Sequence, residues 1–104
     1  MIHPLYDQAL KAFLAGVAAA DPAEAVSRAL PAFEQAPTLI AVGKAAVSMA
    51  RMAQSILGAL PEVLVVTNPE NAINIKGAQV FAAAHPTPDQ IGLQASQAVI
   101  AALQ

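Results

Sequence analysis

The sequence contains no cysteine and no tryptophan, and only 12% of its 104 residues are charged. Without cysteine the chain has no disulfide framework, no thiolate metal site and no cysteine nucleophile, which fits a cytoplasmic protein. Its five basic residues are scattered rather than gathered into a patch, so nucleic acid is not expected as a partner. Neither a Ser-His-Asp arrangement nor a histidine-rich metal spacing is present, and no metal site is predicted.

Long apolar runs are also missing. No stretch approaches the roughly 18 to 20 consecutive apolar residues that span a bilayer, and the apolar segment 10–20 is interrupted by Lys11. Residues 1–4 contain no lysine or arginine, unlike the start of a signal peptide. We therefore expect no membrane span and no export signal, and we predict a cytoplasmic location.

The shortage of charge is accompanied by an excess of apolar residues. Apolar residues make up 57% of the chain, and alanine alone supplies 26 positions, whereas roughly 25% of residues are charged in ordinary globular proteins. A domain this small has a high ratio of surface to volume and should need more polar surface. The composition indicates either one piece of a larger protein, which we favour, or a chain that packs against a second copy of itself.

The spacing of apolar residues predicts two helices followed by alternating strands and helices. Residues 5–20 carry apolar side chains at helical spacing, along one stripe that we expect to be buried. A short helix is predicted to begin at Pro22, with Asp21 as its N-cap and Glu24 completing a capping box, and to end near Pro31. Buried strands are predicted at 38–42, 63–67 and 79–84, and further helices at 45–57 and 88–104.

Strand, helix and strand joined by short connections form a βαβ unit, whose strands are parallel and whose crossover is right-handed. We therefore predict the α/β class, a Rossmann-like layered domain with a parallel sheet, as a single domain over residues 1–104. Three strands are fewer than usual for an open sheet, so the fold is predicted to be incomplete. The loop 68–77 can accommodate a short extended piece. Thr87 is predicted as the N-cap of the last helix, followed by Pro88 and a capping-box Gln90.

Two turns that lead from a strand into a helix carry residues suited to chemistry, Gly43-Lys44-Ala45 and His85–Asp89. If their strands are neighbours in a parallel sheet, both turns lie at the same edge, and Lys44, His85 and Asp89 converge on one cleft. A helix start offers free N–H groups and a positive dipole end to an anion. A cation there costs about 0.3–1 kcal/mol unless an anion compensates. Lys44 therefore points to an anion site.

Each candidate also has a structural interpretation, and the residues alone leave both open. Lys44 can be a surface lysine at a helix start, His85 can hold its turn by hydrogen bonding, and Asp89 can stabilise the helix dipole. Thr67 can simply end its strand. In the functional interpretation Lys44 is catalytic, His85 is a base or a hydrogen-bond donor, and Asp89 binds magnesium or a hydroxyl group. The substrate- or phosphate-binding set is then Gly43, Ala45, Thr67, His85 and Asp89.

Together the two turns resemble the glycerate 2-kinase family, the type whose second domain is called MOFRL and whose members are often labelled hydroxypyruvate reductases. The resembling residues are DPAEAV at 21–26, AVGKAA at 41–46 and AHPTPD at 84–89, followed by Gly92. Their order and spacing match the amino-terminal region of the family over nearly the whole chain. The resemblance implies ATP-dependent phosphorylation of D-glycerate to 2-phosphoglycerate with magnesium, and it places Lys44 in the active-site cleft.

The chain departs from that family in one large respect. Family members are several times longer, and their glycine-and-serine-rich nucleotide loop and acidic carboxyl-terminal motifs have no counterpart here. Phosphoryl transfer needs metal ligands and a phosphate cradle. We therefore expect an amino-terminal fragment that supplies Lys44 to a site completed by a missing carboxyl-terminal domain and that is inactive alone. Glycerate is the expected substrate of the full-length protein, a small phosphorylated acid is expected to bind at the Gly43–Ala45 turn, and ATP and Mg²⁺ are not expected to bind tightly to this chain by itself. The alternatives are a non-catalytic module that self-associates through its alanine-rich helices, and a hydroxypyruvate reductase, although no dinucleotide fingerprint is visible.

Overall fold

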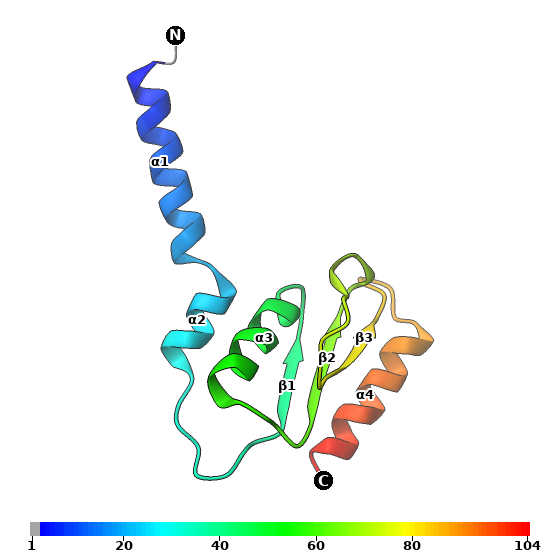
Figure 1. Cartoon of the computed structure of the whole chain (residues 1–104). Helices are drawn as coiled ribbons and strands as arrows, with labels where there is room; N and C mark the ends of the chain where they lie inside the picture. The colour runs from blue at the N-terminus through cyan, green and yellow to red at the C-terminus, as the bar shows by residue number, and fades with distance from the viewer. Residues whose placement is uncertain (1–2) are drawn as a thin grey trace.

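A computed structural model describes residues 3–104, and it shows a parallel β-sheet with helices packed against it (Figure 1). Met1 and Ile2, part of the segment inspected for a signal peptide, lie outside the described residues. The predicted α/β class with a parallel sheet is confirmed. In chain order the elements are α1 (Pro4–Ala19), α2 (Pro22–Ala29), β1 (Leu39–Val42), α3 (Ala46–Leu57), β2 (Val63–Thr67), the 3₁₀-helix η1 (Pro69–Asn71), β3 (Gln79–Ala82) and α4 (Gln90–Ala102).

Within residues 3–104 the sheet has three strands in the order β1-β2-β3, all parallel. Val42 pairs with Val66, and Thr67 pairs with Ala82, so the three carboxyl ends are level. The central strand β2 is buried along most of its length, as its apolar sequence predicts. The edge strand β1 was expected to be covered on both faces, and this is wrong at its end, where Val42 is 67% exposed.

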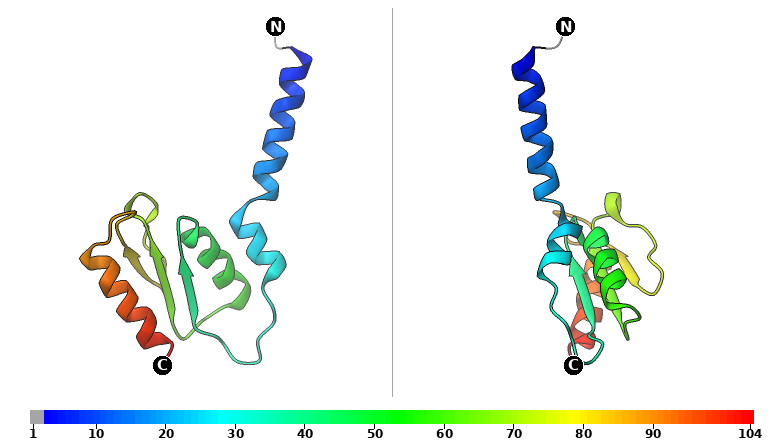
Figure 2. Two further views of the ribbon diagram at one scale, coloured as in Figure 1. Left: turned by 180° about the vertical axis from the view of Figure 1, so that it is seen from behind. Right: turned by 60° about the vertical axis from the view of Figure 1, so that its left-hand side comes forward.

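Alternation of side chains along β2 divides the core between two faces of the sheet. Val63 and Val65 pack against Ala46 and Ala50 of α3 and against Ile75 from the loop before β3. Leu64 points to the other face, where α4 contacts β2 and β3 and buries Ala95. Figure 2 shows α3 and α4 on opposite sides of the sheet. Alanines line the inner side of α3 because small side chains let a helix lie close to a strand.

The two amino-terminal helices differ sharply in their packing. The N-cap of α2 is confirmed, since Asp21 accepts a hydrogen bond from the backbone N–H of Glu24 at 2.9 Å, and α2 then packs against α3. By contrast, α1 stands away from the sheet, and none of its residues is buried (Figure 2). The predicted helix is present, but its predicted buried stripe is wrong, because no other described element covers it. The molecule is accordingly elongated, with extents of 58 × 38 × 19 Å.

Three smaller predictions also need correction. The third strand ends at Ala82 rather than at position 84. The loop 68–77 contains η1, and no strand lies within its described residues, although Ile75 fills the core. The N-cap of α4 is Asp89 rather than Thr87, so the helix begins two residues later than predicted. No helix within residues 3–104 combines the length and apolarity needed to cross a bilayer.

Candidate functional site

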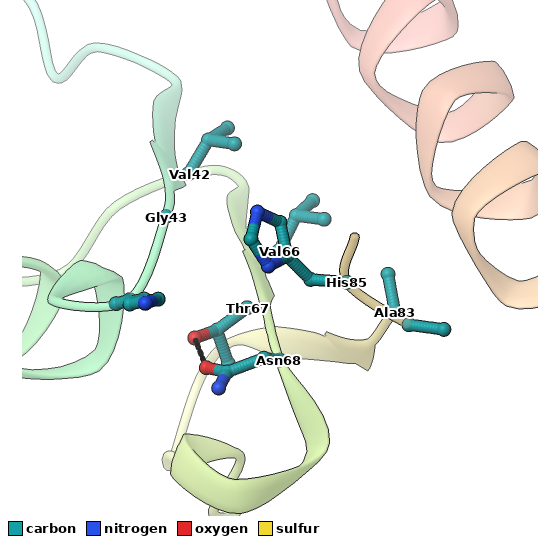
Figure 3. A pocket seen from close by; sticks show the side chains of 9 residues that line it. Val42, Gly43, Val66, Thr67, Asn68, Ala83 and His85 are labelled. Atoms are coloured by element: carbon teal, nitrogen blue, oxygen red, sulfur yellow. Dashed lines mark hydrogen bonds between the residues drawn. The ribbon is translucent and has the colours of Figure 1, made fainter. Parts of the chain in front are cut away.

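A pocket of about 180 Å³ lies at the carboxyl edge of the sheet, where all three strands end. Figure 3 shows residues from the ends of β1, β2 and β3 around it. Ligands of open α/β sheets bind at this edge, because the loops and helix starts that follow the strands gather there. The lining residues are Val42, Gly43, Lys44, Val66, Thr67, Asn68, Ala83, Ala84 and His85.

The turn between β1 and α3 forms one wall of this pocket. Gly43 has a φ of +120°, a backbone conformation that residues with a side chain rarely adopt. Its N–H donates to the carbonyl of Val66 at 2.9 Å, which fastens the turn to β2. The N–H groups of Lys44 and Ala45 have no acceptor among the described residues, and no side chain caps α3. The turn therefore presents free donors at the positive end of a helix.

Lys44 brings a full positive charge to the same turn. The residue is exposed and lines the pocket. Within residues 3–104 the one salt bridge joins Lys11 to Asp7 at 3.1 Å, so no carboxylate neutralises Lys44. A helix start, free N–H groups and a lysine without a counter-ion are the features of an anion site.

The end of β2 contributes Thr67 and Asn68. The side chain of Thr67 is buried, and its hydroxyl donates to Asn68 Oδ1 at 3.2 Å. The carbonyl of Thr67 accepts a hydrogen bond from the backbone N–H of Ala83 at 2.8 Å, which fixes the segment after β3 that forms another side of the pocket. Thr67 had been named from the sequence, but Asn68 had not. The signal for Asn68 was present, because it directly follows a buried strand at the carboxyl edge.

His85 follows β3 and closes the third side of the pocket. Its ring is exposed, and in Figure 3 it lies near Val66 and the Thr67–Asn68 pair. The structural interpretation, a ring that holds its turn by hydrogen bonding, finds no partner for this ring among the described residues. The ring is therefore free to donate to a ligand or to accept from one.

Asp89 and Ala45 do not line the pocket, although both had been named as binding residues. The carboxylate of Asp89 is engaged twice: Oδ1 accepts from Gly92 N at 2.8 Å, and Oδ2 accepts from Ala84 N at 3.2 Å. Asp89 thus starts α4 and supports Ala84 in the pocket wall. Ala45 lies in the turn beside the pocket, where its backbone N–H has no acceptor among the described residues.

In size and chemistry this pocket suits a small anion. Its volume of about 180 Å³ is smaller than that of sites for drug-sized molecules, which commonly occupy about 300–1,000 Å³. Among residues 3–104 no group of three or more His, Cys, Asp or Glu side chains is placed to hold a metal ion. The donors that converge here match a carboxylate or phosphate group.

The sequence and the fold of this chain are similar to those of known proteins. A family model described as "Domain of unknown function (DUF4147)" matches residues 8–104. A protein of Agrobacterium vitis named "Putative hydroxypyruvate reductase" is 34% identical over 97 residues, which cover 88% of this chain and 22% of that protein. The crystal structure of the PH0495 protein from Pyrococcus horikoshii OT3 has a TM-score of 0.84 and 25% identity, over 99% of this chain and 26% of that one. The chain thus spans about a quarter of the length of these relatives.

Proposed function

The chain belongs to the family described as DUF4147, and on that premise we propose that it is the amino-terminal part of an ATP-dependent glycerate 2-kinase. The proposed reaction converts D-glycerate to 2-phosphoglycerate. The observation that carries the proposal is the meeting of Lys44, with its free backbone N–H group, and His85 in one small pocket. Glycerate and its phosphate ester are anions of the size that this pocket accepts.

Lys44 is the proposed catalytic residue. Its ammonium group, with the N–H groups of Lys44 and Ala45, binds the carboxylate of glycerate or the phosphoryl group in transfer. Gly43 gives the turn the conformation that exposes these donors. His85 is proposed to bind a substrate hydroxyl, and Asp89 supports the pocket wall without contacting the substrate.

The residues described here do not fit ATP with Mg²⁺. They offer neither a triphosphate cradle nor a cluster of carboxylates. We propose that both bind to the rest of the longer protein, because this chain covers only about a quarter of its relatives. When bound, they would supply the phosphoryl group and neutralise its charge. The chain alone is then expected to bind substrate without turning it over, and its location is proposed to be the cytoplasm.

Titration with glycerate and 2-phosphoglycerate, followed by NMR chemical shifts, tests the anion site. Shifts are expected at Gly43–Ala46 and near His85. Lys44→Ala should weaken binding about tenfold or more, because a hydrogen bond to a charged group is worth about 1.5–3 kcal/mol. Lys76→Ala is the matched control: it removes the same charge from a residue that precedes β3, at the opposite edge of the sheet. Equal affinities for the two variants would contradict the proposed site.

A kinase assay then tests the reaction. The chain joined to the remaining family domain should form ADP in the presence of glycerate, and Lys44→Ala in that protein should abolish the signal. A protein that binds glycerate but forms no ADP would contradict the kinase while leaving the anion site intact.

The name of the Agrobacterium relative supports a second candidate, a hydroxypyruvate reductase. Hydroxypyruvate is also a small carboxylate, and the same pocket would hold it. The first turn has the sequence VGKAA, however, rather than a dinucleotide-binding fingerprint. Oxidation of NADH or NADPH by hydroxypyruvate in the longer protein, without ADP formation from glycerate and ATP, would establish the reductase instead.

A further inference from the structure

The pair formed by Thr67 and Asn68 has a chemistry that the anion site does not use. A threonine hydroxyl carries one proton and two lone pairs. The proton of Thr67 is engaged, because the hydroxyl donates to Asn68 Oδ1 at 3.2 Å (Figure 3). Only the lone pairs remain for a ligand. In this state the buried oxygen of Thr67 can accept a hydrogen bond from the pocket, but it cannot donate one.

The amide of Asn68 is held in this orientation from two sides. Its Oδ1 also accepts from Asn71 Nδ2 at 2.7 Å, and its Nδ2 donates to a carboxylate oxygen of Glu70. If the Asn68 amide were rotated by 180°, its nitrogen would face the side-chain nitrogen of Asn71 and its oxygen would face the carboxylate of Glu70. Neither pair could form a hydrogen bond. The η1 segment, Pro69–Asn71, therefore fixes the direction of the Thr67 proton.

We propose that Thr67 accepts a hydrogen bond from a hydroxyl group of the ligand, so that the pocket selects small anions that carry a hydroxyl over anions that lack one. The inference rests on the proposed function, since Lys44 takes the anionic group while Thr67 takes the neighbouring hydroxyl. Thr67 determines specificity, and Asn68 is the positioning residue that keeps its oxygen an acceptor.

The selectivity should be modest. The hydroxyl of Thr67 already has one partner, so a ligand without a hydroxyl does not leave it wholly unpaired. The net gain is then that of one ordinary hydrogen bond, about 0.5–1.5 kcal/mol, which corresponds to about 2- to 10-fold in affinity.

The test compares glycerate with propionate, which has the same carbon chain and carboxylate but no hydroxyl. NMR titrations of the 104-residue chain give the ratio of the two dissociation constants. Thr67→Val, which keeps the shape of the side chain and removes its oxygen, should lower the preference for glycerate about 2- to 10-fold. Thr67→Ser keeps the hydroxyl and should retain the preference. A general loss of structure would weaken both ligands together and leave the ratio unchanged.

The positioning role of Asn68 has its own comparison. Asn68→Ala frees the proton of Thr67, so that this hydroxyl can also donate to a carbonyl oxygen. The preference for lactate, which carries a hydroxyl, over pyruvate, which carries a carbonyl in its place, should therefore fall about 2-fold or more. Glu70→Gln is the matched control: the side-chain oxygen of glutamine still accepts from Asn68 Nδ2, so the preference should be retained.

The outcomes separate this inference from the proposed function. Glycerate binding that needs Lys44 and loses its preference in Thr67→Val, but not in Thr67→Ser, supports the inference. Binding that needs Lys44 with an unchanged preference in Thr67→Val overturns the inference alone. If neither glycerate nor 2-phosphoglycerate binds, the anion site and the inference are both overturned.

Discussion

At the residue scale, the carboxylate of Asp89 joins the start of α4 to the wall of the pocket. One oxygen accepts from the backbone of Gly92 and the other from the backbone of Ala84. From the sequence, Thr87 followed by a proline was the stronger cap signal, because Thr87, Pro88 and Gln90 complete a familiar pattern. In the structure Asp89 is the N-cap instead, and its carboxylate also accepts from Ala84, two residues beyond the end of β3.

The cap assignment gives a stability prediction. Asp89→Ala should lower the free energy of unfolding by about 1–2 kcal/mol, because it removes an N-cap and a second hydrogen bond. Asp89→Asn keeps an acceptor and should cost less. Thr87→Ala should change stability by no more than about 0.5 kcal/mol. Urea unfolding followed by circular dichroism measures all three, and a larger loss in Thr87→Ala than in Asp89→Ala would restore the original cap prediction.

At the element scale, α1 and β2 are opposite extremes of the same chain. Both are rich in apolar residues, yet β2 is almost wholly buried and α1 is exposed throughout. Helices in proteins gain most of their stability from packing, and none of the 16 residues of α1 is buried. The structural contribution of α1 to the sheet should therefore be small.

One alanine substitution in α1 and one in β2 test this difference in burial. Phe13→Ala in α1 should change the unfolding free energy of the sheet by less than about 0.5 kcal/mol. Leu64→Ala in β2, where the side chain is 1% exposed, should cost about 2–5 kcal/mol. NMR signals from β2 should be followed, because the one tyrosine, Tyr6, reports only on α1. A large loss of stability in Phe13→Ala would mean that α1 packs on the sheet in solution.

Elements were predictable from the sequence where a local pattern decides them. The bounds of β2 and the N-cap of α2 follow from an apolar run and from Asp21-Pro22, and the family resemblance of the GKAA and HPTPD elements is confirmed. Lys44, Thr67 and His85 line one pocket as expected, because carboxyl ends of parallel strands share an edge. The exposure of α1 and of Val42 was not predictable, since an apolar stripe does not say whether another element will cover it.

At the scale of the whole molecule, the chain exposes more surface than its size requires. Its accessible area is 7269 Å², whereas a compact monomer of this mass exposes about 5,500 Å². The radius of gyration is 17.2 Å, compared with about 13 Å for a compact domain of this length. Both differences agree with the low charge of the sequence, which had suggested that this chain is part of a larger protein.

Small-angle X-ray scattering of a dilute solution should give a radius of gyration near 17 Å, because α1 extends away from the sheet. A value near 13 Å would show that α1 folds back. A value that increases steadily with protein concentration would favour the alternative in which the chain self-associates through its helices.

The exposure of Lys44 and His85 has a consequence for any transfer reaction at this edge of the sheet. Bulk water reaches both side chains, and water is itself an acceptor for a phosphoryl group. A reactive phosphate held here by this chain alone would be open to hydrolysis before the proposed substrate could compete for it. The proposed transfer would therefore require a second surface over the side of the pocket that faces away from β1, β2 and β3, and this surface would keep water from the phosphoryl group.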